Sequence, residues 1–303
     1  MATDKKELTE GRKTFFVVPD LSLMPEEFVP SFFARGFEVY YLMDDQYLDM
    51  ASKVNVIFSL FPDVIIFFNT DRRLNGLQWP AFVRELKSKH KEKARLGVLC
   101  GKAIGEEALR VMERTYLYDI GIHCGCIPLE YRKSRNLAIL DGVLTANEAK
   151  GRRSSLRAIC GPTCTLNFPL RGRLYRAFVR DVSISHFSCE FDGPDPGLEM
   201  YEKVDDIQMK LGGIICAVNA VVYTKRALGE VLLYVFVFRD SRGRDGLDAE
   251  MFAKINGFVH EHFDESVRSL VRKGFEEELS KRRESKSPSA GSTKKGADSH
   301  NAT

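Results

Sequence analysis

The sequence predicts an α/β domain with a doubly wound parallel sheet, followed by a six-stranded antiparallel β-barrel and one C-terminal helix. Short apolar runs alternate with amphipathic segments in the first half of the chain. Closely spaced strand patterns, separated by glycine and proline, fill the second half, and an apolar stripe with helical spacing follows them. We therefore expect an α/β domain over 13–135, a linker over 136–151, the barrel and its helix over 152–278, and a disordered basic tail over 279–303.

The first half contains five strand-like runs, each followed by a polar or helical segment. Parallel strands need crossover helices and are covered on both faces, so this alternation predicts a doubly wound sheet. The expected strands are 14–18, 37–42, 63–68, 95–99 and 119–123, and the expected helices are 25–34, 47–60, 79–90 and 105–116.

The second half contains six strand-like segments with short connections, an arrangement that suits a small barrel because closure removes exposed strand edges. A helix should follow, with Asp248 as its N-cap and with Gly257 and Gly274 weakening it slightly. The tail beyond Ser280 is rich in Ser, Lys, Gly and Ala, which cannot offset the entropy of chain ordering by burial. The expected barrel strands are 164–168, 174–183, 187–191, 206–211, 214–226 and 231–239.

Composition excludes several classes of protein. No apolar run approaches the roughly 20 residues that span a bilayer, and the N-terminus leads into no signal core, which predicts a cytoplasmic protein without a membrane span. Seven cysteines, an odd number, favour reduced thiols over a disulfide framework. Cys124 and Cys126 lie beside His123, but their spacing matches no common zinc pattern. We expect no metal and no cofactor.

The charge distribution argues against a nucleic-acid-binding protein. The net charge is +3, yet the segment after Ser280 alone carries six basic and two acidic residues, so the preceding body is nearly neutral. A basic set in the barrel remains as a candidate nucleic-acid surface, but it lacks the interleaved aromatic rings expected for binding single strands. That set is Arg171, Arg173, Arg176 and Arg180.

The first half resembles the receiver domain of response regulators. Phe61-Pro62-Asp63 opens an apolar run, 64–68, that is similar to the third strand of that family. Asn69 stands at the position of the phosphoacceptor aspartate, and an amide cannot form the acyl phosphate. Asp20 matches one acid after the first strand, but Leu21 follows it where a second acid belongs. The resemblance implies a pseudo-receiver that takes no phosphate.

Two short motifs point to a nucleotide ligand. Arg153-Ser154-Ser155-Leu156-Arg157 is followed, after one strand-like segment, by Asp181-Val182-Ser183-Ile184-Ser185-His186. Guanidinium groups suit phosphate oxygens and the acceptor edge of guanine, whereas a carboxylate suits the donors of guanine. Neither half of the chain shows a catalytic constellation, so we expect a binding protein and no enzyme.

The two motifs resemble the signature of PilZ domains, receptors for cyclic di-GMP, in which R-x-x-x-R precedes D/N-x-S-x-x-G. The resemblance covers about 152–271. It implies that Arg153 and Arg157 grip the phosphates and the guanine acceptor edge, and that Asp181 and Ser183 contact the base. Arg152 would add a further contact. His186 stands where the family has glycine, and its imidazole adds bulk but could also stack on a guanine face.

The resemblance implies a bacterial second-messenger effector, with motility regulation among the outputs expected of the family. The arginines lie on the connection between the two domains, so ligand binding would order 150–157 against the barrel and reorient the pseudo-receiver toward an unidentified protein partner. The alternative is a ligand-independent interaction adaptor, in which His186 has made the nucleotide site degenerate.

Overall fold

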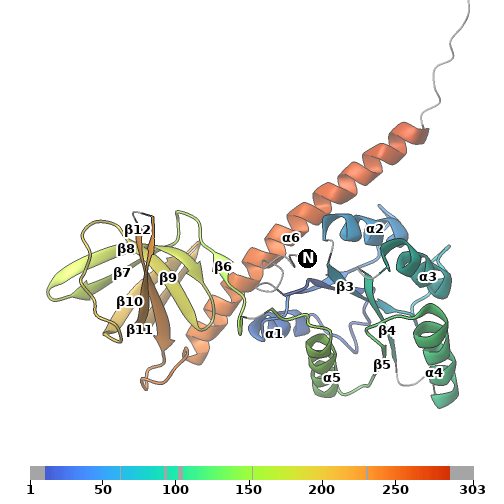
Figure 1. The fold of residues 1–303 in the computed structure, drawn as a ribbon, viewed down its shortest axis with the longest axis horizontal. Coiled ribbons are helices and arrows are strands. Elements are labelled where there is room, and N and C mark those ends of the chain that lie inside the picture. The colour runs from blue at the N-terminus through green and yellow to red at the C-terminus, as the bar shows by residue number, and fades with distance from the viewer. Residues whose placement is uncertain are drawn as a thin grey trace, which may run out of the picture.

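A long C-terminal helix connects two parts of the molecule, an α/β domain and a β-barrel (Figure 1). The computed structural model describes residues 11–61, 63–91, 94–101, 105–151, 153–229 and 231–286. Within these residues, no helix combines the length and the apolar character that crossing a membrane requires.

The α/β domain contains a five-stranded parallel sheet in the order β2-β1-β3-β4-β5. This order is that of flavodoxin-like folds, which include response-regulator receivers, so the predicted doubly wound sheet is confirmed. The strands are β1 (Thr14–Val17), β2 (Val39–Leu42), β3 (Val64–Asn69), β4 (Ala94–Gly101) and β5 (Cys126–Leu129).

Helices cover both faces of the sheet because successive strand residues point to opposite sides. Phe16 packs in a core with α1 (Phe28–Ala34) and α5 (Lys133–Ala146), whereas its neighbours Phe15 and Val17 pack with α2 (Met50–Leu60) and α3 (Trp79–His90). The remaining helix, α4 (Glu106–Glu113), buries no residue and continues into a π-helical segment, η3 (Arg114–Ile120).

Two predictions in this domain were wrong. The expected fifth strand at 119–123 is the end of η3 and the turn after it, because Tyr116 and Ile120 bury one helical face and Gly121 ends the helix with φ +76°. The expected linker over 136–151 is largely α5, which runs to Ala146. Leu140 and Leu144, four residues apart, are fully buried against the sheet, so α5 belongs to the α/β domain.

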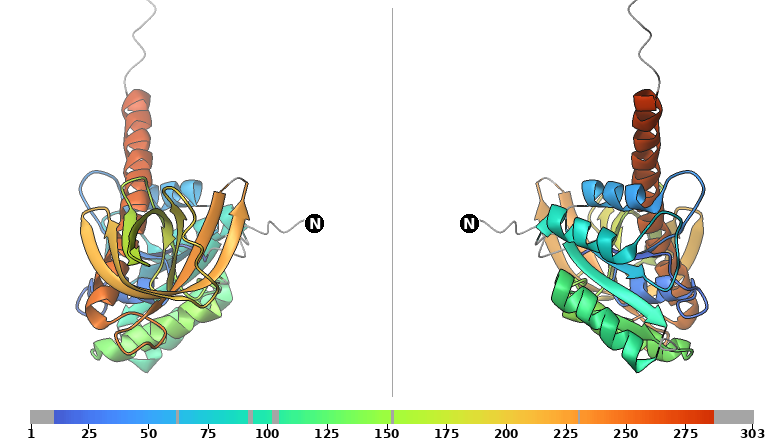
Figure 2. Two further views of the ribbon diagram at one scale, coloured as in Figure 1. Left: turned by 90° about the vertical axis from the view of Figure 1, so that its left-hand side faces the viewer. Right: turned by 90° about the vertical axis from the view of Figure 1, so that its right-hand side faces the viewer.

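The second part is a closed six-stranded antiparallel barrel, as predicted. The strands follow the order β8-β7-β10-β11-β12-β9, and β9 pairs back onto β8. A short strand, β6 (Ala158–Ile159), adds to β8, and Figure 2 (left) looks onto the curved strands from the barrel side. The barrel strands are β7 (Thr165–Leu170), β8 (Arg173–Val182), β9 (His186–Phe191), β10 (Lys203–Leu211), β11 (Ile214–Leu228) and β12 (Val231–Arg239).

The helix α6 (Ala249–Lys286) extends much further than a cover for the barrel would require. Ile255 and Val259 join the barrel core, whereas Val267, two turns later, joins a core of the α/β domain. The carboxylate of Asp248, the expected N-cap, accepts hydrogen bonds from the backbone N–H and hydroxyl of Ser241.

The predicted start of the disordered tail was wrong, because residues 279–286 are helical. Arg282 extends this helix along α2 by donating to the Asp49 carboxylate at 2.6 Å and to Ser52, and it also pairs with Glu278 one turn earlier. These contacts offset the ordering cost that the composition alone predicted to be prohibitive. The rest of the tail, 287–303, lies outside the described residues.

Candidate functional site

Strand pairing brings the two parts of the sequence motif together. We call residues 153–157 the arm; it connects the α/β domain to β6. In the antiparallel ladder Ala158 lies opposite Val182 and Ile159 lies opposite Asp181. Because Arg157 directly precedes this ladder, the pairing places its side chain beside the end of β8, although the two segments are separated in sequence.

Arg157 and Asp181 form the centre of the site. Arg157 Nη1 lies 3.4 Å from Asp181 Oδ1, and about a quarter of each side chain is exposed. The hydroxyl of Ser188, on β9, donates to Asp181 Oδ2 at 2.5 Å. Arg157 Nε and Asp181 Oδ1 are buried and make no hydrogen bond. Buried polar atoms normally have partners, so these two atoms mark a position that a ligand or water would complete.

His186, at the start of β9, contacts Arg157 from the other side. Arg157 Nη2 meets His186 Nε2, and His186 Nδ1 lies 2.7 Å from Ser185 Oγ. Ser185 Oγ in turn lies 3.2 Å from Ser155 Oγ of the arm. The positive φ values of non-glycine residues in the described chain fall elsewhere, so a side chain at position 186 carries no backbone strain.

Ser183 shapes the turn between β8 and β9. It is fully buried, its backbone N–H donates to the carbonyl of His186 at 2.9 Å, and its hydroxyl donates to the same carbonyl at 3.0 Å. A hydroxyl engaged in this way supports the site from beneath, and a ligand could reach it only if the turn opened.

The site is positively charged on balance. Burial lowers the pKa of Arg157 below its ordinary value; Asp181 opposes this shift, and the charges of Arg153 and Arg226 add to it. Arg226 lies on β11 and was missed by the sequence analysis, because only the register of the barrel strands brings it near the arm. No spacing pattern in the sequence indicates this neighbour.

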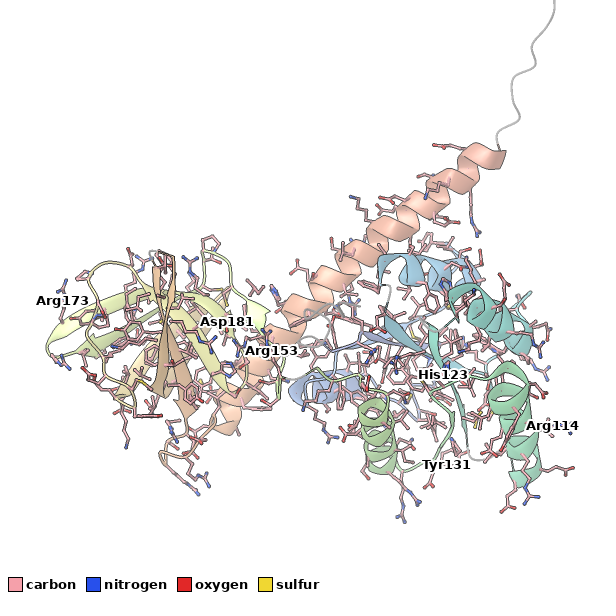
Figure 3. The ribbon with its side chains drawn as sticks, in the orientation of Figure 1. Arg114, His123, Tyr131, Arg153, Arg173 and Asp181 are labelled. Carbon is pink, nitrogen blue, oxygen red and sulfur yellow. The ribbon has the colours of Figure 1, made fainter. Side chains whose placement is uncertain are left out.

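The other predicted ligand residues lie in or next to the arm. Arg153 is exposed, and its charge reaches Arg157 and His186. Arg152 lies outside the described residues. Figure 3 shows Arg153 and Asp181 on the side of the barrel toward the α/β domain, whereas Arg173 lies at the opposite end.

The barrel arginines considered for nucleic acid are exposed, and each has a neighbouring partner. Arg171 pairs with Glu202 at 3.2 Å, and Arg180 pairs with Glu190. Arg173 lies over its neighbour Tyr175, and Arg176 lies over Phe178.

The residue that the receiver resemblance aligns with the phosphoacceptor makes structural hydrogen bonds. Asn69 is buried at the end of β3, its Nδ2 donates to the carbonyl of Val18 at 3.0 Å, and its Oδ1 accepts from the backbone N–H of Asp71 at 3.2 Å. Asp20 accepts from Ser22. Among the described residues, no group of three or more His, Cys, Asp or Glu side chains could hold a metal ion.

No family model and no curated protein matches this chain. Among solved structures, its C-terminal part is similar to the PilZ domain of YcgR from Escherichia coli with c-di-GMP, at a TM-score of 0.33 and 12% identity, covering 40% of this chain and 98% of that one. The MrkH–c-di-GMP complex of K. pneumonia gives a TM-score of 0.35 and 12% identity, covering 40% and 57%. The PlzA protein of Borreliella burgdorferi in complex with c-di-GMP gives 0.23 and 14%, covering 44% and 48%.

The chain therefore spans nearly all of the isolated YcgR domain but only about half of the longer MrkH and PlzA chains. With TM-scores of 0.35 or lower, these similarities do not assign a function to this chain.

Proposed function

We propose that this chain is a cyclic di-GMP-binding effector whose ligand site lies between the arm and the barrel. The observation that carries the proposal is the pair of buried atoms without hydrogen bonds, Arg157 Nε and Asp181 Oδ1, at the meeting point of the two motifs. A guanidinium and a carboxylate, side by side, match the acceptor and donor edges of guanine, and the exposed guanidinium of Arg153 suits a phosphate.

The remaining residues take supporting roles in the proposed site. Arg152, outside the described residues, is proposed to add a further contact. Ser183 holds the turn that presents Asp181, and His186 lies against Arg157 within reach of a base. Binding needs no bond to be made or broken, so the proposed activity is not enzymatic.

We further propose that the ligand acts on the position of the two domains. The arm residue Leu156 packs against the cores of both the α/β domain and the barrel. A ligand that draws Arg153 toward the barrel and takes Arg157 from its present partners would therefore act next to a side chain that lies in the domain junction. The expected output is a change in the surface offered to a protein partner.

One observation favours the alternative of a ligand-independent adaptor. Arg157 already contacts His186 and Asp181, so a ligand has to compete with an internal network for the guanidinium. In that case the barrel would support protein contacts alone.

Isothermal titration of the full chain with cyclic di-GMP separates the two functions. We expect saturable heat with the wild type and at least about a tenfold loss of affinity in Arg153→Ala and Arg157→Ala, since a hydrogen bond to a charged group contributes about 1.5–3 kcal/mol. Arg173→Ala is the matched control, because this arginine lies at the far end of the barrel (Figure 3), and it should bind like the wild type.

The absence of heat with a folded wild-type protein would favour the adaptor. Unchanged affinity in both arm variants would place the ligand elsewhere on the molecule.

A further inference from the structure

The contacts of His186 favour one protonation state. An arginine guanidinium can only donate, so the imidazole nitrogen that meets Arg157 Nη2, Nε2, must be an unprotonated acceptor. A neutral imidazole then carries its single proton on Nδ1, where Ser185 Oγ lies 2.7 Å away and accepts it. Ser185 can pass a hydrogen bond on to Ser155 of the arm at 3.2 Å. The arm is thus held at two points, by Arg157 to His186 on β9 and by Ser155 to Ser185 in the turn before β9.

We propose that His186 is a positioning residue, whose neutral imidazole holds Arg157 on the barrel in the ligand-free protein and makes the docking of the arm depend on one proton. A protonated imidazole would present an N–H and a positive charge to the guanidinium, so it cannot hold Arg157. In ligand binding, His186 acts through Arg157 in addition to any contact with the ligand itself.

The surroundings of His186 favour the neutral form in the ligand-free protein. Burial is the largest cause of a lowered pKa at His186, and the charges of Arg157 and Arg153 on the arm and of Arg226 on β11 lower it further. Asp181, on β8, is the opposing charge.

The pH dependence of arm docking follows from this lowered pKa. Docking is strongest above the ordinary histidine pKa of about 6.5, and it weakens as the pH falls from there through the lowered pKa of the docked state.

An anionic ligand should make the protonated form of His186 the favoured one, and this part of the inference rests on the proposed function. A phosphate that approaches Arg153 and Arg157 offsets their charge at His186, and it offers an acceptor to a protonated Nε2. The pKa of His186 should therefore be higher in the complex than in the free protein. At a pH between the two pKa values, binding takes up a proton. The affinity for the ligand then increases by at most about tenfold for each unit by which the pH is lowered.

A ligand-free experiment tests the contact between His186 and Arg157 directly. The histidine ring signals of the full chain are titrated by NMR, and His186→Gln identifies the signal that belongs to His186. We expect a His186 pKa below 6.5 that rises in Arg157→Ala and stays unchanged in Arg173→Ala. A His186 pKa that has the ordinary value and does not change in Arg157→Ala would overturn the proposal.

Titrations with cyclic di-GMP test the coupling to the ligand. At one pH near 6.5, the binding heat of the wild type should vary with the ionisation enthalpy of the buffer and report proton uptake. His186→Gln keeps an acceptor for Arg157 without a titratable group, so it should bind with no proton uptake and with an affinity that is flat with pH. His186→Phe keeps the ring but has no acceptor, and it should bind at least about tenfold more weakly than His186→Gln.

The outcomes separate this inference from the proposed function. If the wild type binds without proton uptake, the coupling is wrong and the effector function stands. If the wild type does not bind, the effector function and its ligand coupling fail together, and the NMR titration still decides whether His186 holds Arg157.

Discussion

Asn69 has a structural role at the carboxyl end of β3. Its Nδ2 donates to the carbonyl of Val18, a buried β-branched residue in the left-handed region at φ +46°. Such a conformation is costly for valine and persists only where neighbouring contacts hold it. The amide of Asn69 therefore helps to stabilise the backbone at the end of β1, which is a structural role.

Replacing Asn69 by aspartate should destabilise the protein. The carboxylate would face a carbonyl that it cannot bond, and a buried unsatisfied polar group costs about 1–3 kcal/mol. Urea unfolding measures this loss. Asn55→Asp is the control, because Asn55 is partly exposed and lies 2.8 Å from Lys89 Nζ, so a change below about 0.5 kcal/mol is expected there. Equal stability of Asn69→Asp and the wild type would contradict the role of the amide.

The sequence singles out the candidate site residues, but it does not predict all of the contacts between them. Arg157 and Asp181 form a recognisable pair of motifs, and the β6–β8 ladder brings them together. The contact between His186 and Arg157 was not foreseeable, because it depends on the turn that Ser183 closes. Arg226 depends on the register of β11, which hydrophobic patterning does not specify.

At the scale of elements, the apolar stripe of α6 predicts that a helix forms but not which core each of its residues joins. The stripe correctly predicts helix formation from residue 249 onward, but not that Ile255 and Val267 serve different cores. The end of the helix was missed for a related reason. Arg282 is held by Asp49 and Ser52 of α2, and such long-range partners are invisible in a segment of low local hydrophobicity.

Replacing each of the two glycines of α6 by alanine should change the stability of the protein in opposite directions. A Cβ at Gly274 would lie 2.7 Å from Val56 Cγ1 and 3.2 Å from Leu60 Cδ1, both on α2, whereas nothing lies within 4 Å of a Cβ at Gly257. Gly257→Ala should raise stability by up to about 1 kcal/mol through helix propensity. Gly274→Ala should lower it by about 1–3 kcal/mol, because helix packing must open to admit the methyl group.

Thermal and urea unfolding measure both glycine variants. Stabilisation by Gly274→Ala would show that α6 does not approach α2 closely at this point.

At the scale of the whole molecule, the two domains share buried surface. Leu156, in the arm, and Phe263, on α6, each pack against both cores, and Tyr40 in β2 reaches the backbone carbonyl of Phe263 through its hydroxyl at 3.5 Å. The arm and α6 therefore meet at one hydrophobic junction. The proposed reorientation of the domains would require a movement of the arm at Arg157 to pass through the adjacent Leu156, which packs against both cores.

This junction should make the two domains unfold together. Differential scanning calorimetry of the wild type should show one cooperative transition, since α6 contributes side chains to both cores. Leu156→Ala combined with Phe263→Ala removes both shared side chains and should split the transition into two, one for each domain. Phe258→Ala is the matched control, because Phe258 packs against the barrel core and not against either core of the α/β domain.

Phe258→Ala should lower the transition temperature, because truncating a large side chain that packs against a core costs about 2–5 kcal/mol of stability. It should not split the transition, because it leaves the junction between the domains intact. Two transitions in the wild type would mean that the domains are thermodynamically independent. In that case Leu156 could not carry a signal from the arm to the α/β domain, and a ligand at Arg157 would act on the barrel alone.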